Sequence, residues 1–429
     1  MVPDSSVTLE SEFDITDYIK KLARYPTYEK KSKTAFQLGN HPSCPQTHVL
    51  QELPVLINRI MTGDSFSRGW RSTSATLFFT CLSLIALKEM GGTAVKINEL
   101  MVSLATTLKY PESDQTLRKT YTGIESLDYG MRHIVAAFLP GVAGWDVNTQ
   151  VQQIYFLASF FPIISIWSVE AGRQGNAPSF LRWTSVWALF YQTVGGAVVI
   201  PLWYVLFFRN SAKQSSWSPA SRLLDISYAK ALFPALILGY LLPTIALYIP
   251  FPDSEFRIHQ AFIVLWQPSP LYVNLLIFII STFITKQETT KRANKSQINL
   301  KYLHRVYSAG LAVSAIVHIV IMALCISQRL SQVSFVHSLL HVPATERLTL
   351  SGSLHYLFQV DCLVILTAAL ASAWGVMWDL KNFGKADIST GEIAIQMTVS
   401  TVLLGPGATV AGVWLLREHM MADKFVKKA

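Results

Sequence analysis

Charged residues are scarce in this sequence. Asp, Glu, Lys and Arg make up 15% of its 429 residues, and 51% of the residues are hydrophobic. Soluble domains contain about 25% charged residues. The mean hydropathy of +0.33 shows the same bias. This composition argues against two or three soluble domains and indicates a membrane protein that crosses the bilayer several times.

Cysteine and cofactor motifs are also missing. The four cysteines stand apart, with no CxxC pair and no spacing typical of a metal site. The sequence has no DDxxD, NDxxD, DxDD or HExxH, and no Walker A or GxGxxG motif. These absences predict a chain without a disulfide framework or metal site, and a function that needs no metal, nucleotide or redox cofactor.

The N-terminus lacks the features of a cleavable signal peptide. It reads MVPDSSVTLESEFD, which is acidic and polar where a signal peptide is basic and then apolar. We therefore expect the first internal spanning helix to direct insertion, with the endoplasmic reticulum as the destination. The net charge of +9 predicts basic loops at a membrane face and no nucleic-acid partner, because no basic stripe with interleaved aromatic residues occurs.

Seven apolar segments have the length that a hydrocarbon core of about 30 Å requires. Several contain proline, and a kinked helix needs neighbours that satisfy its freed carbonyl groups, so a packed bundle is predicted. The predicted fold class is an all-α membrane protein with seven or eight transmembrane helices. The seven segments lie near 151–169, 183–208, 231–250, 269–285, 308–327, 354–378 and 394–416.

The remaining chain is more polar. Residues 1–130 are predicted to be an N-terminal extension, partly helical and cytosolic or interfacial, and residues 131–429 the transmembrane domain. Residues 75–87 are apolar but short, which favours a buried or interfacial helix over a span.

The charges of the loops suggest an orientation and expose a conflict. Segments 209–230 and 286–307 are rich in Lys and Arg, which places them on the cytoplasmic side. With seven spans, the basic tail after residue 416 then falls on the opposite side, against that rule. Either the tail is an exception or one span has been miscounted.

One carboxylate lies inside an apolar run. Residues 357–366 read LFQVDCLVIL and contain Asp361. A charge near the bilayer centre costs on the order of 2.5–3.5 kcal/mol. Asp361 is therefore either a structural group hydrogen-bonded to a neighbouring helix, with Gln359 or His318 as partners, or a functional acid that burial keeps protonated.

Two further ionisable residues are candidates. Glu170, in WSVEAGRQGN, shares a helix face with Trp167 and is either a buried acid or a solvated partner of Arg173. His318, in AIVHIVIMAL, is either a weak base or a satisfied core histidine.

Aromatic residues make up 12% of the chain and suit a cavity for a cationic intermediate. Protonation of an alkene or epoxide produces a carbocation, which requires exclusion of water. An aromatic face stabilises a cation by roughly 0.5–2 kcal/mol. Gln192 equally suits an interhelical hydrogen bond. The residues predicted to line the substrate are Trp167, Tyr191, Gln192, Trp203 and Tyr204.

Five short stretches carry a family resemblance. WSVEAGRQGN, GGAVVIPLWY, ALFPALILGYLLPT, LFQVDCLVIL and GPGATVAGVWLLREH occur in this order. Over roughly residues 145–420 the sequence resembles fungal integral-membrane terpene cyclases of meroterpenoid and indole-diterpene biosynthetic clusters.

The resemblance implies an enzyme of secondary metabolism, of the isomerase or lyase type. It implies metal-free cyclisation of a lipophilic isoprenoid or prenylated aromatic substrate, or of its epoxide, after a prenyltransferase and an epoxidase. By position it implies Glu170 and Asp361 as candidate acids. For a cyclase, we expect His318 or the second carboxylate to take the final proton. The composition alone equally permits a transporter of the pathway product or a non-catalytic membrane scaffold.

Overall fold

The computed structural model describes residues 64–213, 218–252, 255–284, 292–327, 333–384 and 388–426. These residues are helical and contain no strand, apart from an isolated β-bridge between Lys109 and Thr116. The all-α prediction is confirmed. Residues 1–63, about half of the predicted N-terminal extension, lie outside the described residues.

Five helical segments in the described part are long and apolar enough to cross a membrane. Helices α11 (Arg257–Trp266) and α12 (Ser269–Phe283) are bent by 56° and form a sixth if counted as one span. The predicted count of seven or eight spans is not confirmed. The five segments are Ser72–Thr107 in α3 (Asp64–Thr107), Val147–Gly172 (α5), Ala220–Leu247 (α8 to α10), Ser296–Ser327 in α13 (Arg292–Ser327) and Leu350–Asn382 (α14).

Helix α3 departs from its prediction. Residues 75–87 are part of this 44-residue helix, which continues through less apolar sequence and reaches a spanning length. It packs against α7 (Gly196–Ser211) and α14. The predicted boundary at residue 130 therefore separates helices that belong to one compact unit, Gly63–Ala429.

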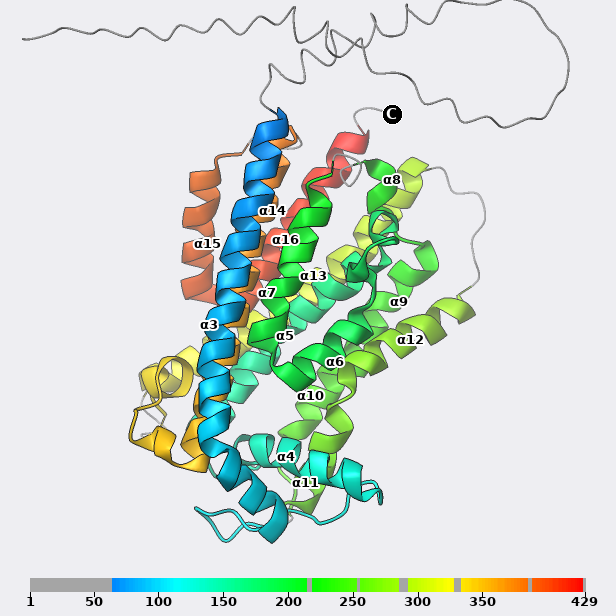
Figure 1. Ribbon diagram of the computed structural model, residues 1–429. Helices are drawn as coiled ribbons and strands as arrows, with labels where there is room; N and C mark the ends of the chain where they lie inside the picture. Colours follow the sequence, from blue (N-terminus) through cyan, green and yellow to red (C-terminus); the bar gives the residue numbers. More distant parts are fainter. Residues whose placement is uncertain are drawn as a thin grey trace, which may run out of the picture. The chain divides into compact units, whose positions relative to one another are not determined.

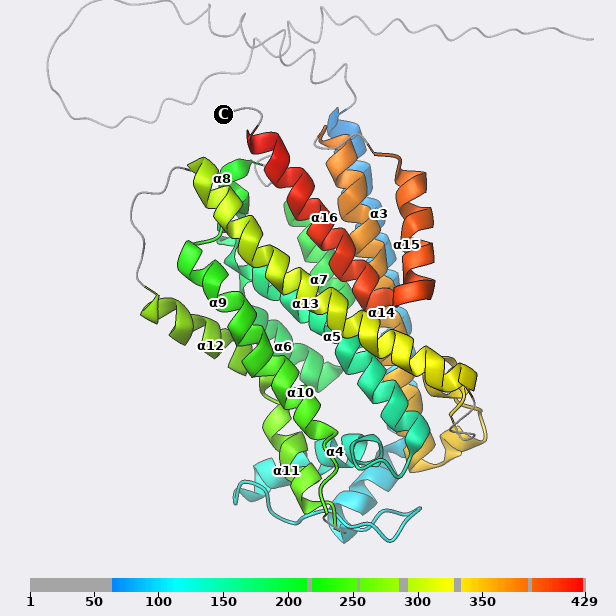
Figure 2. The same ribbon diagram turned by 180° about the vertical axis from the view of Figure 1, so that it is seen from behind.

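Two predicted spans are each broken into two helices. Segment 183–208 forms α6 (Thr184–Val194) and α7, which meet at Gly195 with φ +110°. Segment 394–416 forms α15 (Thr390–Leu404) and α16 (Pro406–Val426), which meet at Gly405 with φ +89°. A positive φ ends a helix, and glycine adopts it without a steric penalty. Figures 1 and 2 show α16 turning back from the end of α15.

The break at Gly405 resolves the conflict between the basic tail and the predicted number of spans. With six spans, α3 begins and α16 ends at the same end of the bundle, where α8 (Pro219–Arg222) also lies (Figure 1). The tail is then on the same side as the basic segments around α8 and at the start of α13. The arrangement agrees with the positive-inside rule.

The opposite end of the bundle is closed by α4 (Glu125–Val142), which packs against α5 and α11. Asp128 fixes the loop before α4 by accepting hydrogen bonds from the backbone N–H groups of Tyr121, Thr122 and Gly123 and from the Thr122 hydroxyl. Burial raises the pKa of the Asp128 carboxyl, but these hydrogen bonds outweigh it and leave the pKa below its ordinary value.

Candidate functional site

Asp361 projects from α14 to the first turn of α7. Its Oδ1 accepts a hydrogen bond from the backbone N–H of Ala197 at 2.5 Å. The first N–H groups of a helix have no partner within the helix, and at membrane depth water does not supply one. The positive end of the helix dipole also favours a carboxylate there. Asp361 therefore satisfies the start of a helix that begins inside the bundle, which is the structural one of its two predicted roles.

Apolar side chains from two helices surround this junction. A Cβ placed on Gly195 would lie 2.8 Å from Met90 Cε of α3, and one on Gly196 would lie 2.7 Å from Ile365 Cδ1 of α14. Among the described side chains, no Lys, Arg or His forms an ion pair with Asp361. Neither Gln359 nor His318, the partners considered from the sequence, forms a hydrogen bond to it; both bond to other groups. Asp361 is thus a carboxyl group with amide donors and apolar neighbours.

A continuous row of aromatic rings begins one helical turn from Asp361. Phe358 packs edge-on against Phe138 with centroids 4.9 Å apart, and Phe138 lies 5.4 Å from Trp266. The row continues through Tyr240, Phe160, Tyr191 and Trp167 to Trp203, with neighbouring centroids 4.9–6.4 Å apart.

The row contains three of the residues predicted to line the substrate, and Tyr204 packs on Trp203 at 5.3 Å. Gln192 donates from Nε2 to the Gln267 carbonyl oxygen at 3.2 Å and joins two helices. Trp203 and Tyr204 are fully buried against their neighbours. Their role with a substrate stays a prediction. Phe358 was missed, although its position three residues before Asp361 was a sufficient signal.

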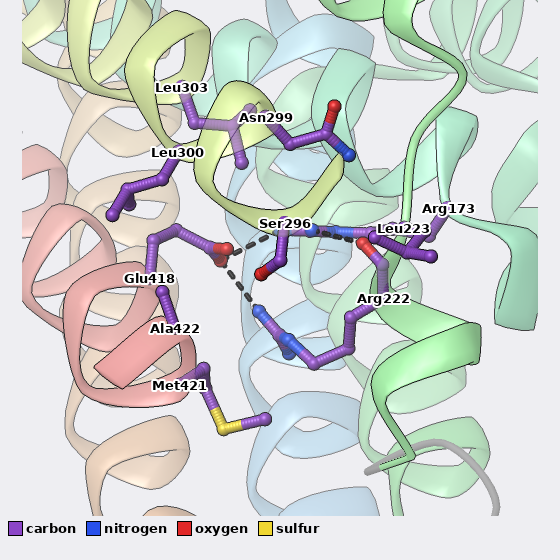
Figure 3. Close-up of a pocket in the computed structure, with 10 residues that line it drawn as sticks. All are labelled: Arg173, Arg222, Leu223, Ser296, Asn299, Leu300, Leu303, Glu418, Met421 and Ala422. Carbon is purple, nitrogen blue, oxygen red and sulfur yellow. Dashed lines mark hydrogen bonds and ion pairs between the residues drawn. The ribbon is translucent and has the colours of Figure 1, made fainter. Parts of the chain in front are cut away.

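Glu170 lies in a buried charged cluster that we call the arginine cluster. Its Oε1 is 3.0 Å from Arg417 Nη1 and 3.5 Å from Arg173 Nε, and its Oε2 accepts from Asn176 Nδ2 at 3.1 Å. Glu418 is 2.7 Å from both Arg173 Nη2 and Arg222 Nη2, as Figure 3 shows. The arginine cluster consists of Glu170, Arg173, Arg222, Arg417 and Glu418.

The arginine cluster changes the interpretation of Glu170. The ion pair with Arg173 was predicted as a solvated alternative, but Glu170 is only 3% exposed. A carboxylate engaged by two guanidinium groups is an ion-pair partner and poorly suited to donate a proton. The sequence does not link Arg417 and Glu418 to this cluster, because 245 or more residues separate them from their partners on α5 and in the adjoining loop.

The two predicted acids lie at opposite ends of α7. Asp361 bonds to Ala197 in its first turn, while Asn210 in its last turn donates to Asn176, which in turn donates to Glu170. Asn210 is 13 positions after Ala197, and with a rise of about 1.5 Å per residue the two ends of α7 are about 20 Å apart. Asp361 and Glu170 therefore cannot act on the same atom.

His318 of α13 has an arrangement parallel to that of Asp361. Its Nε2 is 3.1 Å from the carbonyl oxygen of Val402 in the last turn of α15, and its Nδ1 is 3.0 Å from the Tyr155 hydroxyl. Because a carbonyl only accepts, Nε2 carries the proton and Nδ1 accepts from Tyr155. His318 thus satisfies the end of α15, beside the break at Gly405, and both ring nitrogens are occupied.

Within the described ranges, no three His, Cys, Asp or Glu side chains lie close enough to hold a metal ion. The prediction of a reaction without a cofactor stays a prediction. The fold and the site define a class: the described residues form a helical bundle with five or six candidate membrane spans, helices that break inside the bundle, and buried carboxylates.

A family comparison refines this class. The model of the CtvD domain matches residues 75–422, and the chain belongs to this family. The chain is 26% identical over 307 residues to terpene cyclase ascI of Acremonium egyptiacum, covering 68% of this chain and 78% of the relative. It is 28% identical over 207 residues to terpene cyclase ctvD of Aspergillus terreus, covering 46% and 58%. These relatives support an enzyme of the terpene cyclase type. No solved structure matches the chain.

A further relative has a different name. The FAD-dependent monooxygenase verC1 of Penicillium polonicum is 26% identical over 267 residues, which cover 62% of this chain but 32% of the relative. The matching region is therefore about a third of that longer protein.

Proposed function

We propose that this enzyme is a membrane-bound terpene cyclase that closes rings in a prenyl chain, or in its terminal epoxide, after protonation by Asp361. The family match over residues 75–422 and the relatives named terpene cyclase support the activity. They favour it over export of a product or a scaffold. The observation that carries the residue assignment is the setting of Asp361, which has apolar neighbours and amide donors, while Glu170 is engaged by arginines.

In this mechanism the carboxylic acid of Asp361 transfers its proton to the terminal alkene carbon or to the epoxide oxygen. Protonating the alkene breaks its π bond and leaves a tertiary cation on the neighbouring carbon. Protonating the epoxide opens its C–O bond and leaves a hydroxyl group and the same type of cation. Internal alkenes then attack in turn, and each attack forms one C–C bond. The aromatic row beginning at Phe358 offers ring faces to the moving positive charge.

Loss of a proton from carbon next to the last cation ends the reaction, so product and substrate are isomers. The N–H groups of Gly196 and Ala197 stabilise the carboxylate that Asp361 becomes after the first step. This carboxylate is the nearest base that the geometry offers. Glu170 lies about 20 Å away at the far end of α7, and both nitrogens of His318 are occupied.

The upstream chemistry and the location follow as parts of the proposal. The relatives that are FAD-dependent monooxygenases support an oxygenase that supplies the terminal epoxide, after a prenyltransferase has attached the chain. The lipophilic substrate would reach the enzyme in the bilayer of the endoplasmic reticulum.

The experiment uses microsomes from cells expressing the full chain. A prenylated phenol and its terminal epoxide are supplied, and mass spectrometry looks for a product of unchanged mass and shifted retention. The test variant is Asp361→Asn, because asparagine still offers a carbonyl oxygen to Ala197 N–H but has no acidic proton. The expected result is an isomer with the wild type that falls at least about 100-fold with Asp361→Asn, the scale of general acid catalysis.

Two results would contradict the proposal in different ways. No isomer from any supplied substrate, with the protein present at normal abundance, would argue against the cyclase activity. An isomer formed equally well by Asp361→Asn would retain the activity and remove Asp361 from its mechanism.

A further inference from the structure

The arginine cluster carries more positive than negative charge. It contains three guanidinium groups and two carboxylates, and each of the five side chains is only 3–9% exposed. Among the described ion pairs, no third carboxylate joins the cluster. A buried charge without a partner is strongly unfavourable. One unit of positive charge is therefore left inside the protein and requires a counter-ion.

Two of the guanidinium groups also keep N–H donors without an acceptor. Arg417 reaches Glu170 and Glu418 through Nη1 alone, and its Nε is buried with no hydrogen-bond partner. The Trp414 ring covers one face of this guanidinium at 4.5 Å, but the N–H groups lie in the guanidinium plane and need an acceptor beside it. Arg222 bonds through Nη2 to Glu418, which is the one hydrogen bond that the described residues give its side chain. The surplus charge is thus accompanied by surplus donors.

A small cavity lies beside these donors. Its volume is about 30 Å³, and Arg173, Arg222 and Arg417 all line it. Glu170 is the one carboxylate in its lining, and both of its oxygens are engaged, Oε1 by arginines and Oε2 by Asn176. A water molecule needs roughly 10–15 Å³ of such space. The cavity therefore suits a monatomic anion and is too small for a phosphate or a lipid head group.

A second cavity of about 30 Å³ has a different lining. Figure 3 shows it with the Glu418 carboxylate and the Arg222 guanidinium pointing toward each other. Asn299 also lines it, and its buried Oδ1 has no hydrogen-bond partner. An oxygen acceptor needs a donor, which an anion cannot supply but a water molecule can. The anion is therefore assigned to the first cavity, which Arg417 lines and Glu418 does not.

We propose that the cavity lined by Arg173, Arg222 and Arg417 binds one chloride ion. The ion accepts hydrogen bonds from guanidinium N–H groups that have no other acceptor and balances the surplus charge. It thereby joins α16, which carries Arg417, to α8, which carries Arg222. The ion is a structural ligand, and the inference does not depend on the cyclase proposal.

The first test measures the melting temperature of the purified full chain in an uncharged detergent. Chloride replaces gluconate, which is too large for the cavity, at constant ionic strength, so that screening stays the same. A ligand that binds only the folded state stabilises it. We expect the melting temperature to rise by about 1–3 °C for each tenfold increase in chloride above its dissociation constant. Bromide should act like chloride, and sulfate should act like gluconate.

Two variants locate the effect. Arg222→Gln leaves two cations and two anions in the cluster, and Glu418 keeps its contacts with Arg173 and Arg417. The variant should therefore fold, and its melting temperature should not depend on chloride. Arg209→Gln is the matched control, because it removes the same charge from an exposed position at the end of α7 that does not line the cavity. It should keep the full dependence.

A direct measurement does not rely on a variant. In crystals of the wild-type chain soaked in bromide, an anomalous peak should lie in contact with the guanidinium groups of Arg222 and Arg417. This map decides the question if Arg222→Gln does not fold.

Three results would overturn the inference: equal melting temperatures in chloride and gluconate, the same chloride dependence in Arg222→Gln and the wild type, or no bromide peak at the cavity. None of them bears on cyclisation by Asp361, which is measured separately as isomer formation.

Discussion

The break between α15 and α16 depends on Gly405, and its replacement by alanine should be unusually destabilising. With φ +89° and ψ 158°, Gly405 occupies a region of backbone conformation that is almost restricted to glycine. A Cβ there would lie 2.8 Å from Cγ and Nδ1 of His318. The substitution therefore introduces both backbone strain and a collision with a ring held by two hydrogen bonds.

The cost of the backbone strain and the cost of the collision with His318 can be separated by comparison with a second glycine, Gly384. Strain in such a conformation costs about 1–3 kcal/mol, and forcing an extra methyl group into packed surroundings costs about 1–3 kcal/mol more. Gly384 also has a positive φ, +62°, but nothing lies within 4 Å of a Cβ placed on it. Gly384→Ala should therefore cost only the strain, about 1–2 kcal/mol, while Gly405→Ala should cost about 2–6 kcal/mol.

The assay is reversible unfolding of the purified chain in mixed micelles, with the free energy of unfolding compared among variants. The double variant Gly405→Ala/His318→Ala removes the ring and should recover the part of the loss that comes from the collision. If Gly405→Ala proves no more destabilising than Gly384→Ala, or if removing His318 recovers nothing, the close approach of α13 to the break is wrong.

Three other predictions follow from the fold and the site. Glu170→Gln should destabilise the protein by about 3–5 kcal/mol, because it removes one partner from a buried ion-pair network. Asp361→Asn should leave the stability unchanged, because it keeps an acceptor for the Ala197 N–H group. The free energies of unfolding of the two variants, measured side by side, test this contrast. Peptide tags at the two chain ends should both be digested by protease added to intact microsomes, while a tag at the exposed end of α10 (Leu242–Leu247), near residue 250, should be protected. Protection of only one terminal tag would contradict an even number of spans. Asp128 has a pKa below its ordinary value in the folded state, so its contribution to stability is complete above an unfolded value of about 3.9 and is lost as the pH falls through the lower folded value. Asp128→Asn should reduce the dependence of the melting temperature on pH in that acidic range, and an unchanged dependence would show that other groups cause it.

The sequence predicts the helical class because apolar composition and length are local properties. It does not reveal the breaks at Gly195 and Gly405, since an apolar segment reads as a span whether or not its backbone turns back in the middle. The sequence contained one signal of such a break, the conflict between the basic tail and an odd number of spans. Because α15 and α16 enter and leave the bundle at the same end, they do not count as a span, and the basic tail lies on the same side as the other basic segments.

The candidate site, like the fold, could be predicted only in part: the sequence indicates the two acids but not their partners. Asp361 and Glu170 stand out in the sequence because each is an acid next to an apolar segment. Their partners do not, because Ala197 is 164 residues from Asp361 and Arg417 is 247 residues from Glu170. The partners separate the two acids physically: amide donors and apolar walls at one, guanidinium groups at the other. Residue type alone therefore could not rank them as proton donors.

The capping role of Asp361 and its proposed catalytic role depend on the same contact. A helix start at membrane depth needs an acceptor, and a carboxyl group supplies one whether or not it carries a proton, because its carbonyl oxygen accepts in both states. The N–H group of Ala197 can thus hold Asp361 in place before proton transfer and stabilise the carboxylate after it. Asp361→Leu removes both roles and should lower stability and isomer formation, whereas Asp361→Asn keeps the acceptor and should lower isomer formation alone. Equal loss of folded protein in the two variants would mean that the ionised carboxylate itself, and not merely an acceptor oxygen, is needed to start α7.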